Sequence, residues 1–223
     1  MDSLQHLVGT PQLLALAAAL GWASGIRLYA AVFLVGAAGF MGWIELPQGL
    51  QILRHPGVLG AAGFMCFVEF FADKIPLLDT VWDAIHTLIR IPAGAALAAG
   101  ALGADGAAMS WIGAILGGGL AATSHAAKMT TRAAVNTSPE PFSNIAVSLL
   151  EDGFVVFMLW LSATHPLLFA LALVLTLVIA VVLMVVLVKF LRSVLRGLSR
   201  FFSGEGLPPG KTNVQENPDR QPR

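Results

Sequence analysis

A stretch of ionisable residues in the first half of the chain carries groups that could do chemistry. Glu69 and Asp73 are four residues apart, Lys74 follows directly, and Pro76 comes next. After Pro76 the charged pattern resumes at helical intervals with Asp79, Asp83, His86 and Arg90. Because side chains three, four or seven residues apart share one face of a helix, the stretch predicts a charged stripe that Pro76 interrupts once.

The sequence around this stripe is suited to a lipid bilayer. Hydrophobic residues make up 57% of the 223 residues, charged residues make up 12%, and the mean hydropathy is +0.78. A soluble domain usually carries about 25% charged residues. The length allows about six membrane-spanning helices of roughly 20 residues each. The sequence therefore predicts an all-α, polytopic helical membrane protein with one transmembrane domain.

Charged groups inside a membrane need partners or water. A charge at the bilayer centre costs about 2.5 to 3.5 kcal/mol on insertion scales, so several unpaired charges would offset the insertion energy of a whole apolar helix. A second charged face comes from His125, Lys128 and Arg132, at positions i, i+3 and i+7. Glu151 and Asp152 fall in the first two turns of the next predicted helix. We expect these complementary faces to meet in one polar site.

Breaks in the apolar pattern give the predicted helices. The apolar run 13–43 follows Pro11 at a first helical position, and it is too long for one straight crossing. Ser24, Gly25 and Arg27 mark the expected break, which would carry Arg27 to mid-depth. A loop or short interfacial helix at 44–56 is expected next, followed by a helix over 57–74 and a helix that begins near Thr80 as its N-cap. The next helix is expected over 107–135, the one after it begins at Ser143 or Asn144 as its N-cap, and the last covers 166–188.

The last part of the chain changes character. Lys189, Arg192, Arg196 and Arg200 recur at near-helical spacing among apolar residues, which predicts a basic helix lying along an anionic membrane surface. An excess of Lys and Arg marks the cytoplasmic side, and an even number of crossings would place both termini there. The predicted regions are a short N-terminal segment 1–12, a transmembrane helical domain 13–188, a basic juxtamembrane helix 189–203 and a disordered cytoplasmic tail 204–223.

The arrangement of the predicted helices also allows an internal symmetry. Each half of the chain would contain three helices, and two such halves in tandem would have opposite orientations in the membrane. Many transporters are built from inverted repeats of this kind, with broken helices at the binding site. Two inverted three-helix halves with broken helices are therefore an expectation for the fold.

Two segments carry a resemblance to a known family. FADKIPLLDTVWDAIHTLIRIPAG at 71–94 and HAAKMTTRAAVNTSPEPFSNIAVSLLEDG at 125–153 resemble the DUF4126-type family of uncharacterised bacterial integral membrane proteins. The likeness spans most of 13–187. It implies a multi-pass protein of the bacterial inner (cytoplasmic) membrane, and it implies no activity.

Transport is the leading functional expectation. The substrate would be a small anionic or zwitterionic solute or a lipid headgroup, the lipid bilayer would be the surrounding partner, and a proton would be the candidate coupling ion. Neither a cofactor nor a metal is expected, and the net charge of +0 argues against nucleic acid. No hydrophobic pattern favours a monomer over an oligomer. Substrate binding is expected from Arg27, Arg90, Lys128, Arg132, His86 and His125, and coupling or charge pairing from Glu69, Asp73, Lys74, Asp79, Asp83, Glu151 and Asp152.

Two other classes of function stay open at this point. A structural or assembly protein would pair its embedded charges permanently, which fixes helix register at some cost in stability. A membrane enzyme acting on a lipid phosphate could use His125 or His86 as acid or base, although the HExxH, GxSxG and Walker patterns are absent from the sequence. Asp79, Asp83 and His86 could also hold a divalent cation, but the nearby basic residues weaken that alternative.

Overall fold

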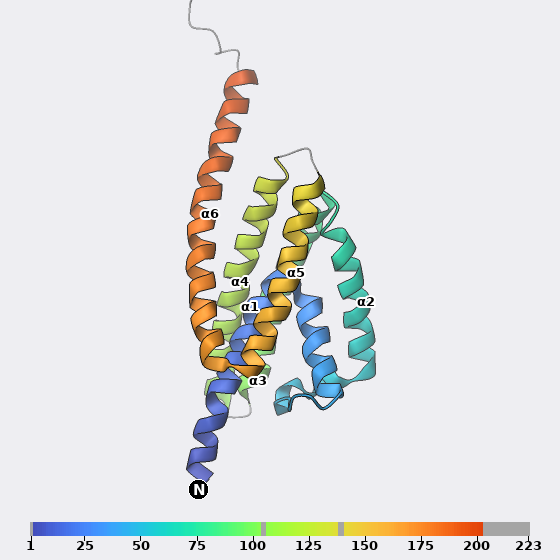
Figure 1. Ribbon diagram of the computed structural model, residues 1–223, viewed down its shortest axis with the longest axis vertical. Coiled ribbons are helices and arrows are strands. Elements are labelled where there is room, and N and C mark those ends of the chain that lie inside the picture. The colour runs from blue at the N-terminus through green and yellow to red at the C-terminus, as the bar shows by residue number, and fades with distance from the viewer. Residues whose placement is uncertain (1, 104–105, 138–140, 203–223) are drawn as a thin grey trace, which may run out of the picture.

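The computed structural model describes residues 2–103, 106–137 and 141–202, and every element in those ranges is a helix (Figure 1). The elements are α1 (Asp2–Phe40), the 3₁₀-helix η1 (Gln48–Arg54), α2 (Pro56–Ala72), α3 (Leu78–Leu102), α4 (Ala107–Val135), α5 (Pro141–Thr164) and α6 (Pro166–Phe202). Five helices are long and apolar enough to span a membrane. The pair formed by η1 and α2, bent by 70°, would be a sixth span. The prediction of an all-α polytopic membrane protein is confirmed.

The predicted break in the first helix is present at Arg27. The backbone of Arg27 is not helical (φ −142°, ψ 71°), and the chain turns back there, so that the arms 2–26 and 28–40 run in opposite directions (Figure 1). The start of α1 differs from the prediction, because the helix already begins at Asp2 and Pro11 lies inside it. Pro11 instead begins the part of α1 that is apolar enough to span a membrane. The break carries Arg27 into the helix bundle.

Small residues hold the first arm of α1 against α3 and α4. A Cβ atom placed on Gly21 would lie 2.6 Å from the Cα of Gly117, and one placed on Gly113 would lie 2.6 Å from the carbonyl oxygen of Ala98. A Cβ on Gly117 would also collide with the carbonyl oxygen of Gly94. Glycine at such contacts lets helix backbones approach closely inside a membrane. These three helices therefore form the tightly packed centre of the bundle.

The expected N-caps are not used as caps. Leu77, at φ 71°, precedes α3, so α3 begins before Thr80, and within its first turn the Asp79 carboxylate accepts a hydrogen bond from the adjacent Thr80 N–H at 2.6 Å. Likewise, α5 begins before Ser143 and Asn144. Both helices start earlier than these residue types predict, because Thr, Ser and Asn also serve as ordinary hydrogen-bonding side chains in the first turn.

The helix α6 is the most exposed of the long helices. Only 6% of its most apolar part is buried, and the helix continues without a break from Pro166 to Phe202, extending past the other helices (Figure 1). The basic segment around Lys189 and Arg192 therefore continues in line with the spanning segment 166–188 as one helix, instead of forming a separate helix. The tail predicted at 204–223 lies outside the described residues.

Two expectations about symmetry and orientation depend on the break in α1. Because α1 turns back, its first residues and the last residues of α6 lie at opposite ends of the molecule (Figure 1). The sequence-based expectation of an even number of crossings counts α1 as one complete crossing, whereas α1 turns back at Arg27. The helix α4 runs from Ala107 to Val135 as a single helix, so the two halves differ in this respect. The inverted repeat itself stays a prediction.

The close approach of α4 to its neighbours gives a first test. Gly117→Ala should lower the free energy of unfolding by about 1 to 3 kcal/mol, because the added methyl group overpacks the contact with α3. Gly119→Ala is the matched control on the same helix, since the space around Gly119 is open, and its effect should stay within about 0.5 kcal/mol. Thermal unfolding of the purified protein in detergent measures both. Equal stability of the two variants would contradict the packing described here.

Candidate functional site

Charged side chains from α1 to α5 meet in one cluster, which we call the ion-pair network. Its members are Arg27, Glu69, Asp73, Lys74, Asp79, Asp83, Arg90, Lys128, Arg132, Glu151 and Asp152. Most are fully buried, and only Lys74, Glu151 and Asp152 are partly exposed. The structure thus brings together every charged Asp, Glu, Lys and Arg side chain that the sequence analysis assigned to the site.

Arg90 of α3 forms ion pairs that join α3 to α2. Its Nη2 donates to Glu69 Oε1 at 2.6 Å, and its Nη1 donates to Asp83 Oδ1 at 2.7 Å. The side chain of Arg90 is 0% exposed. A guanidinium group presents several donors in one plane, so it can hold two carboxylates at the same time. Arg90 therefore connects two acids from different helices.

Lys128 contacts the broken helix α1 and two of the network carboxylates, Asp73 and Asp83. Its Nζ lies 2.6 Å from Asp73 Oδ2 and 3.1 Å from Asp83 Oδ1, and it donates to the carbonyl oxygen of Ile26 at 3.2 Å. The carbonyl oxygen of Gly25 is 3.1 Å from His125 Nδ1. A break in a helix leaves carbonyl groups without intrahelical partners, and at membrane depth these groups need protein partners. Side chains of α4 supply partners to the break in α1.

Arg27 lies at the tip of the broken helix and faces α5. Its guanidinium group pairs with Asp73, its Nε lies 2.8 Å from Asp152 Oδ1, and its Nη2 donates to Ser148 Oγ at 2.9 Å. Asp152 also pairs with Lys74, at 3.5 Å. Arg27 therefore bridges the end of α2 and the middle of α5.

Arg132 forms the end of the network nearest the α4–α5 turn. Its Nη2 lies 2.7 Å from Glu151 Oε2, and its Nη1 donates to the carbonyl oxygen of Asp73 at 3.0 Å and to the side chain of Asn144. Asp79 lies 3.8 Å from Arg132 and accepts a hydrogen bond from Asn136 Nδ2 at 3.0 Å. The two helical faces that the sequence predicts to be complementary are in direct contact here.

Asp73 and Lys74 follow α2, and burial and neighbouring charges act in opposite directions on the pKa of each. Burial acts to raise the pKa of the Asp73 carboxyl, but Lys128 and Arg27 outweigh this effect, so that pKa lies below its ordinary value. Burial lowers the pKa of the Lys74 ammonium group, and the attraction of Asp152 offsets only part of the effect. Asp73 is therefore the anion at the centre of the network, shared by two cations.

The two predicted histidines take different positions. His125 belongs to the site, because its Nδ1 lies 3.4 Å from Arg90 Nη1 and its Nε2 lies 2.7 Å from Thr87 Oγ1. His86 makes no ion pair among the described contacts. Its ring stacks on Trp82 with centroids 4.2 Å apart and packs edge-on against Tyr29 at 5.7 Å. The spacing of His86 from Asp83 predicts a shared helix face correctly but does not distinguish an ionic neighbour from an aromatic one.

Several uncharged residues at the site are not among the sequence-based candidates. Asn144 and Ser148 contact Arg132 and Arg27, and they precede Glu151 by seven and three positions. That spacing places all three on one face of α5, so the helical pattern contains the signal. Asn136 follows Arg132 by one turn and contacts Asp79. Polar residues one turn from a buried charge are thus its partners here.

The network contains more acid than base. Six carboxylates face five cations, and Glu69 Oε2, Asp73 Oδ1 and Asp83 Oδ2 are buried oxygens with no hydrogen-bond partner in the described part of the protein. A carboxylate oxygen in that situation is suited to accept a proton or a donor group from a ligand. Within the described ranges, no group of three or more His, Cys, Asp or Glu side chains is arranged to hold a metal ion.

The comparisons with known proteins give one finding. A family model described as "Domain of unknown function (DUF4126)" matches residues 14–186. Neither a curated protein nor a solved structure matches the chain.

Removing the cation between Glu69 and Asp83 tests the energetics of the network. Arg90→Ala should lower the free energy of unfolding by about 3 to 5 kcal/mol, because two buried carboxylates lose their partner. Arg54→Ala is the matched control, since Arg54 is exposed and lies outside the network, and it should change stability by less than about 0.5 kcal/mol. Thermal unfolding in detergent compares the two. A fully stable Arg90→Ala protein would show that Glu69 and Asp83 do not depend on this cation.

Proposed function

Since the chain belongs to the DUF4126 family, whose description states no function, we propose from the site itself that this protein is a membrane transporter. The substrate is an anionic or zwitterionic solute or lipid headgroup, and the site is the ion-pair network. The observation that carries the proposal is the surplus of carboxylates over cations in the network, together with three buried carboxylate oxygens that have no hydrogen-bond partner among the described residues. A site of this composition can exchange its internal partners for a ligand and a proton.

The alternative of a permanent structural lock predicts a different pattern of contacts. A buried polar group without a partner costs about 1 to 3 kcal/mol, so a network that only fixes helix register gains stability by satisfying all its members. Among the residues that the structure describes, the Nε atoms of Arg90 and Arg132 are also buried without hydrogen-bond partners, in addition to the carboxylate oxygens. These open donors and acceptors support a network that can rearrange.

The broken helix α1 supports the same function. Discontinuous helices place helix ends and free backbone groups at the binding sites of many transporters. In this chain the break presents Arg27 and the carbonyl oxygens of Gly25 and Ile26 to the network. Movement of one arm of α1 would change the partners of Lys128 and Arg27 together, which gives alternating access a physical basis.

Charge balance makes a proton the candidate coupling ion. When an anionic ligand pairs with Arg27 or Arg90, the carboxylate that held that cation loses its partner. An unpaired buried carboxylate favours its protonated form, so uptake of a proton restores the balance. Anion and proton would then move in the same direction. Glu69 is one carboxylate suited to this role, because one of its two oxygens accepts no hydrogen bond from any residue that the structure describes.

The proposed location is the bacterial inner (cytoplasmic) membrane. The exposed basic residues Lys189, Arg192 and Arg196 on α6 favour the cytoplasmic side for the C-terminal end of that helix. The ends of α2 and α4 lie toward the same end of the bundle as the C-terminal part of α6 (Figure 1), and Lys74 follows α2 while Arg132 is in the last turn of α4, which supports this orientation. The beginning of α1 would then face the opposite side, which differs from the sequence-based expectation that both termini are cytoplasmic.

The structural alternative keeps one observation in its favour. Each of the five cations in the network lies within 4.0 Å of at least one carboxylate. A protein that only holds its helices in register would show the same pairs. The lipid-phosphate enzyme gains no such support, because both ring nitrogens of His125 already contact Gly25 and Thr87.

Flux measurements in proteoliposomes test transport. Phosphate, small carboxylates and a fluorescent anionic phospholipid are offered with and without a pH gradient. Asp152→Asn should reduce the flux of the transported compound about tenfold, comparable to the loss of one ion pair in the rate-limiting state, and should weaken its response to the pH gradient. Asp152 is partly exposed, so the variant is expected to fold.

Glu45→Gln is the matched control, because Glu45 is an exposed acid outside the network and should leave the flux unchanged. The transport proposal fails if none of the offered compounds crosses the membrane with the wild-type protein. It also fails if Asp152→Asn lowers only thermal stability while any measured flux is the same as that of Glu45→Gln. Either result would support the structural alternative.

A further inference from the structure

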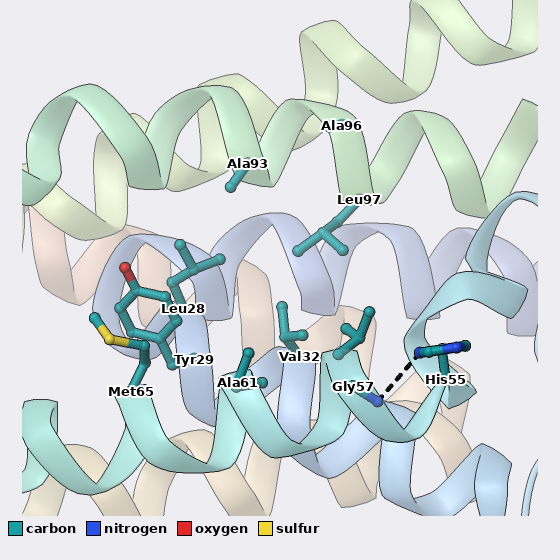
Figure 2. Close-up of a pocket in the computed structure, with 12 residues that line it drawn as sticks. Leu28, Tyr29, Val32, His55, Gly57, Ala61, Met65, Ala93, Ala96 and Leu97 are labelled. Carbon is teal, nitrogen blue, oxygen red and sulfur yellow. Dashed lines mark hydrogen bonds between the residues drawn. The ribbon is translucent and has the colours of Figure 1, made fainter.

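Two apolar cavities lie between α2 and α3, which make few contacts with each other. The first has a volume of about 550 Å³, and its lining includes Val32, Ala61, Met65, Ala93 and Leu97 (Figure 2). The second has a volume of about 480 Å³ and is lined by Phe67, Val68, Phe71, Ala72, Ile75, Leu78 and Trp82. We call the two cavities together the α2–α3 seam. Volumes of this size are typical of ligand sites.

The α2–α3 seam opens toward the lipid-facing surface of the bundle. Ala61 on α2 and Ala96 on α3 are exposed on the rim of the first cavity, and Phe67 and Phe71 are exposed at the second. Both helices belong to segments that are suited to cross a membrane. A lateral, apolar opening at membrane depth is accessible to hydrocarbon chains of the bilayer and unfavourable for water.

An aromatic group joins the seam to the ion-pair network. Tyr29 lines the first cavity, Trp82 lines the second, and the ring of His86 packs against both, with centroids 5.7 and 4.2 Å away. His86 lies on the same face of α3 as Asp83 and Arg90 of the network. The three aromatic rings therefore connect residues that line the cavities to the face of α3 that carries the charged site.

The network also approaches the seam from α2. Glu69 follows the lining residue Met65 by one helical turn, and its side chain is 1% exposed, with Oε2 buried and without a hydrogen-bond partner in the described ranges. On α2 as on α3, a charged residue of the network thus lies one turn or less from a residue that lines the seam. A ligand that has an apolar chain and a charged head could contact both regions at once.

The far end of the first cavity lies next to an exposed basic residue in the sequence. His55 lines this end, and its Nδ1 accepts a hydrogen bond from the Gly57 N–H at 3.1 Å, while Arg54 precedes it as an exposed cation (Figure 2). A cation beside an apolar groove at the membrane surface, here Arg54, is complementary to a lipid phosphate. This end therefore favours an anionic phospholipid over an uncharged hydrocarbon ligand.

We propose that the α2–α3 seam binds an acyl chain of an anionic membrane phospholipid, and that the lipid headgroup is the substrate of the ion-pair network. The acyl chain stays in the seam, and the headgroup passes between the Arg54–His55 end and the network behind Tyr29, His86 and Trp82. The inference rests on the proposed function in taking the network as the headgroup site. The binding of the acyl chain is a separate claim that can be measured alone.

Photo-crosslinking in liposomes tests acyl-chain binding with the full chain. The probe is a phosphatidylglycerol that carries a diazirine in one acyl chain, and mass spectrometry of the digested protein locates the label. Label is expected to concentrate at the seam, around 61–65 and 93–97, above the level on α6. Ala93→Phe fills the first cavity and should reduce seam labelling about tenfold, through lost apolar contact.

Matched variants separate a filled cavity from a misfolded protein. Ala61→Phe fills the same cavity from α2 and should give the same loss, whereas Ala126→Phe adds the same ring on the exposed face of α4 and should leave seam labelling unchanged. All three should elute like the wild-type protein. Seam labelling no higher than that of α6, or unchanged in both filling variants, would overturn the inference.

The flux assay separates this inference from the proposed function. If a soluble anion is transported while the seam carries no excess label, the protein transports a solute and the lipid inference is wrong. If the seam is labelled and filling it abolishes flux of the fluorescent phospholipid, both proposals hold. If the seam is labelled as expected and no compound shows flux, acyl-chain binding holds, whereas transport and the assignment of the headgroup as substrate fail.

Discussion

The arrangement of the helices depends on the ion pairs of Asp73. In the low dielectric of the bundle interior, Asp73 can be an anion only because cations contact it. Lys128 and Arg27 reach it from different helices, and each of these cations has a second acidic partner, Asp83 or Asp152. Removing one member therefore changes the charge balance of several others. This mutual dependence gives a buried network a strong influence on how the helices are arranged, and it makes the arrangement sensitive to any ligand that competes for one cation.

Close helix packing allows the charges to meet. Arg27 reaches Asp73 because α1 breaks at that residue, and the helix before the break lies against α4 through Gly21, which contacts Gly117, and Gly25, which contacts Ala121. Larger residues at these contacts would separate the backbones and lengthen the ion pairs. The charged network thus depends on the small-residue contacts, which bring α1, α3 and α4 close together. The helix α2 packs less tightly against α3.

The loose position of α2 gives the site two chemically different sides. Toward the centre of the bundle, Glu69 contacts Arg90, and toward the bilayer the same helix contributes Met65 and Phe67 to apolar cavities. His86 and its aromatic neighbours lie at the boundary between these sides. An amphiphilic ligand matches such a boundary better than a fully hydrated ion does, because it can place its apolar chain and its charged group in their preferred surroundings simultaneously.

The sequence by itself determined the membrane class, the bounds of α4 and the break at Arg27, because apolar length, turn residues and a lone buried arginine are local signals. It also determined which side chains share a helix face, and hence that the acids of α5 would face the bases of α4. Only the tertiary structure decided that α1 turns back, that His86 meets aromatic rings instead of carboxylates, and that Asn144 binds Arg132 instead of capping a helix. These outcomes depend on which helices become neighbours, and helical periodicity specifies a face but not the residue that it will contact.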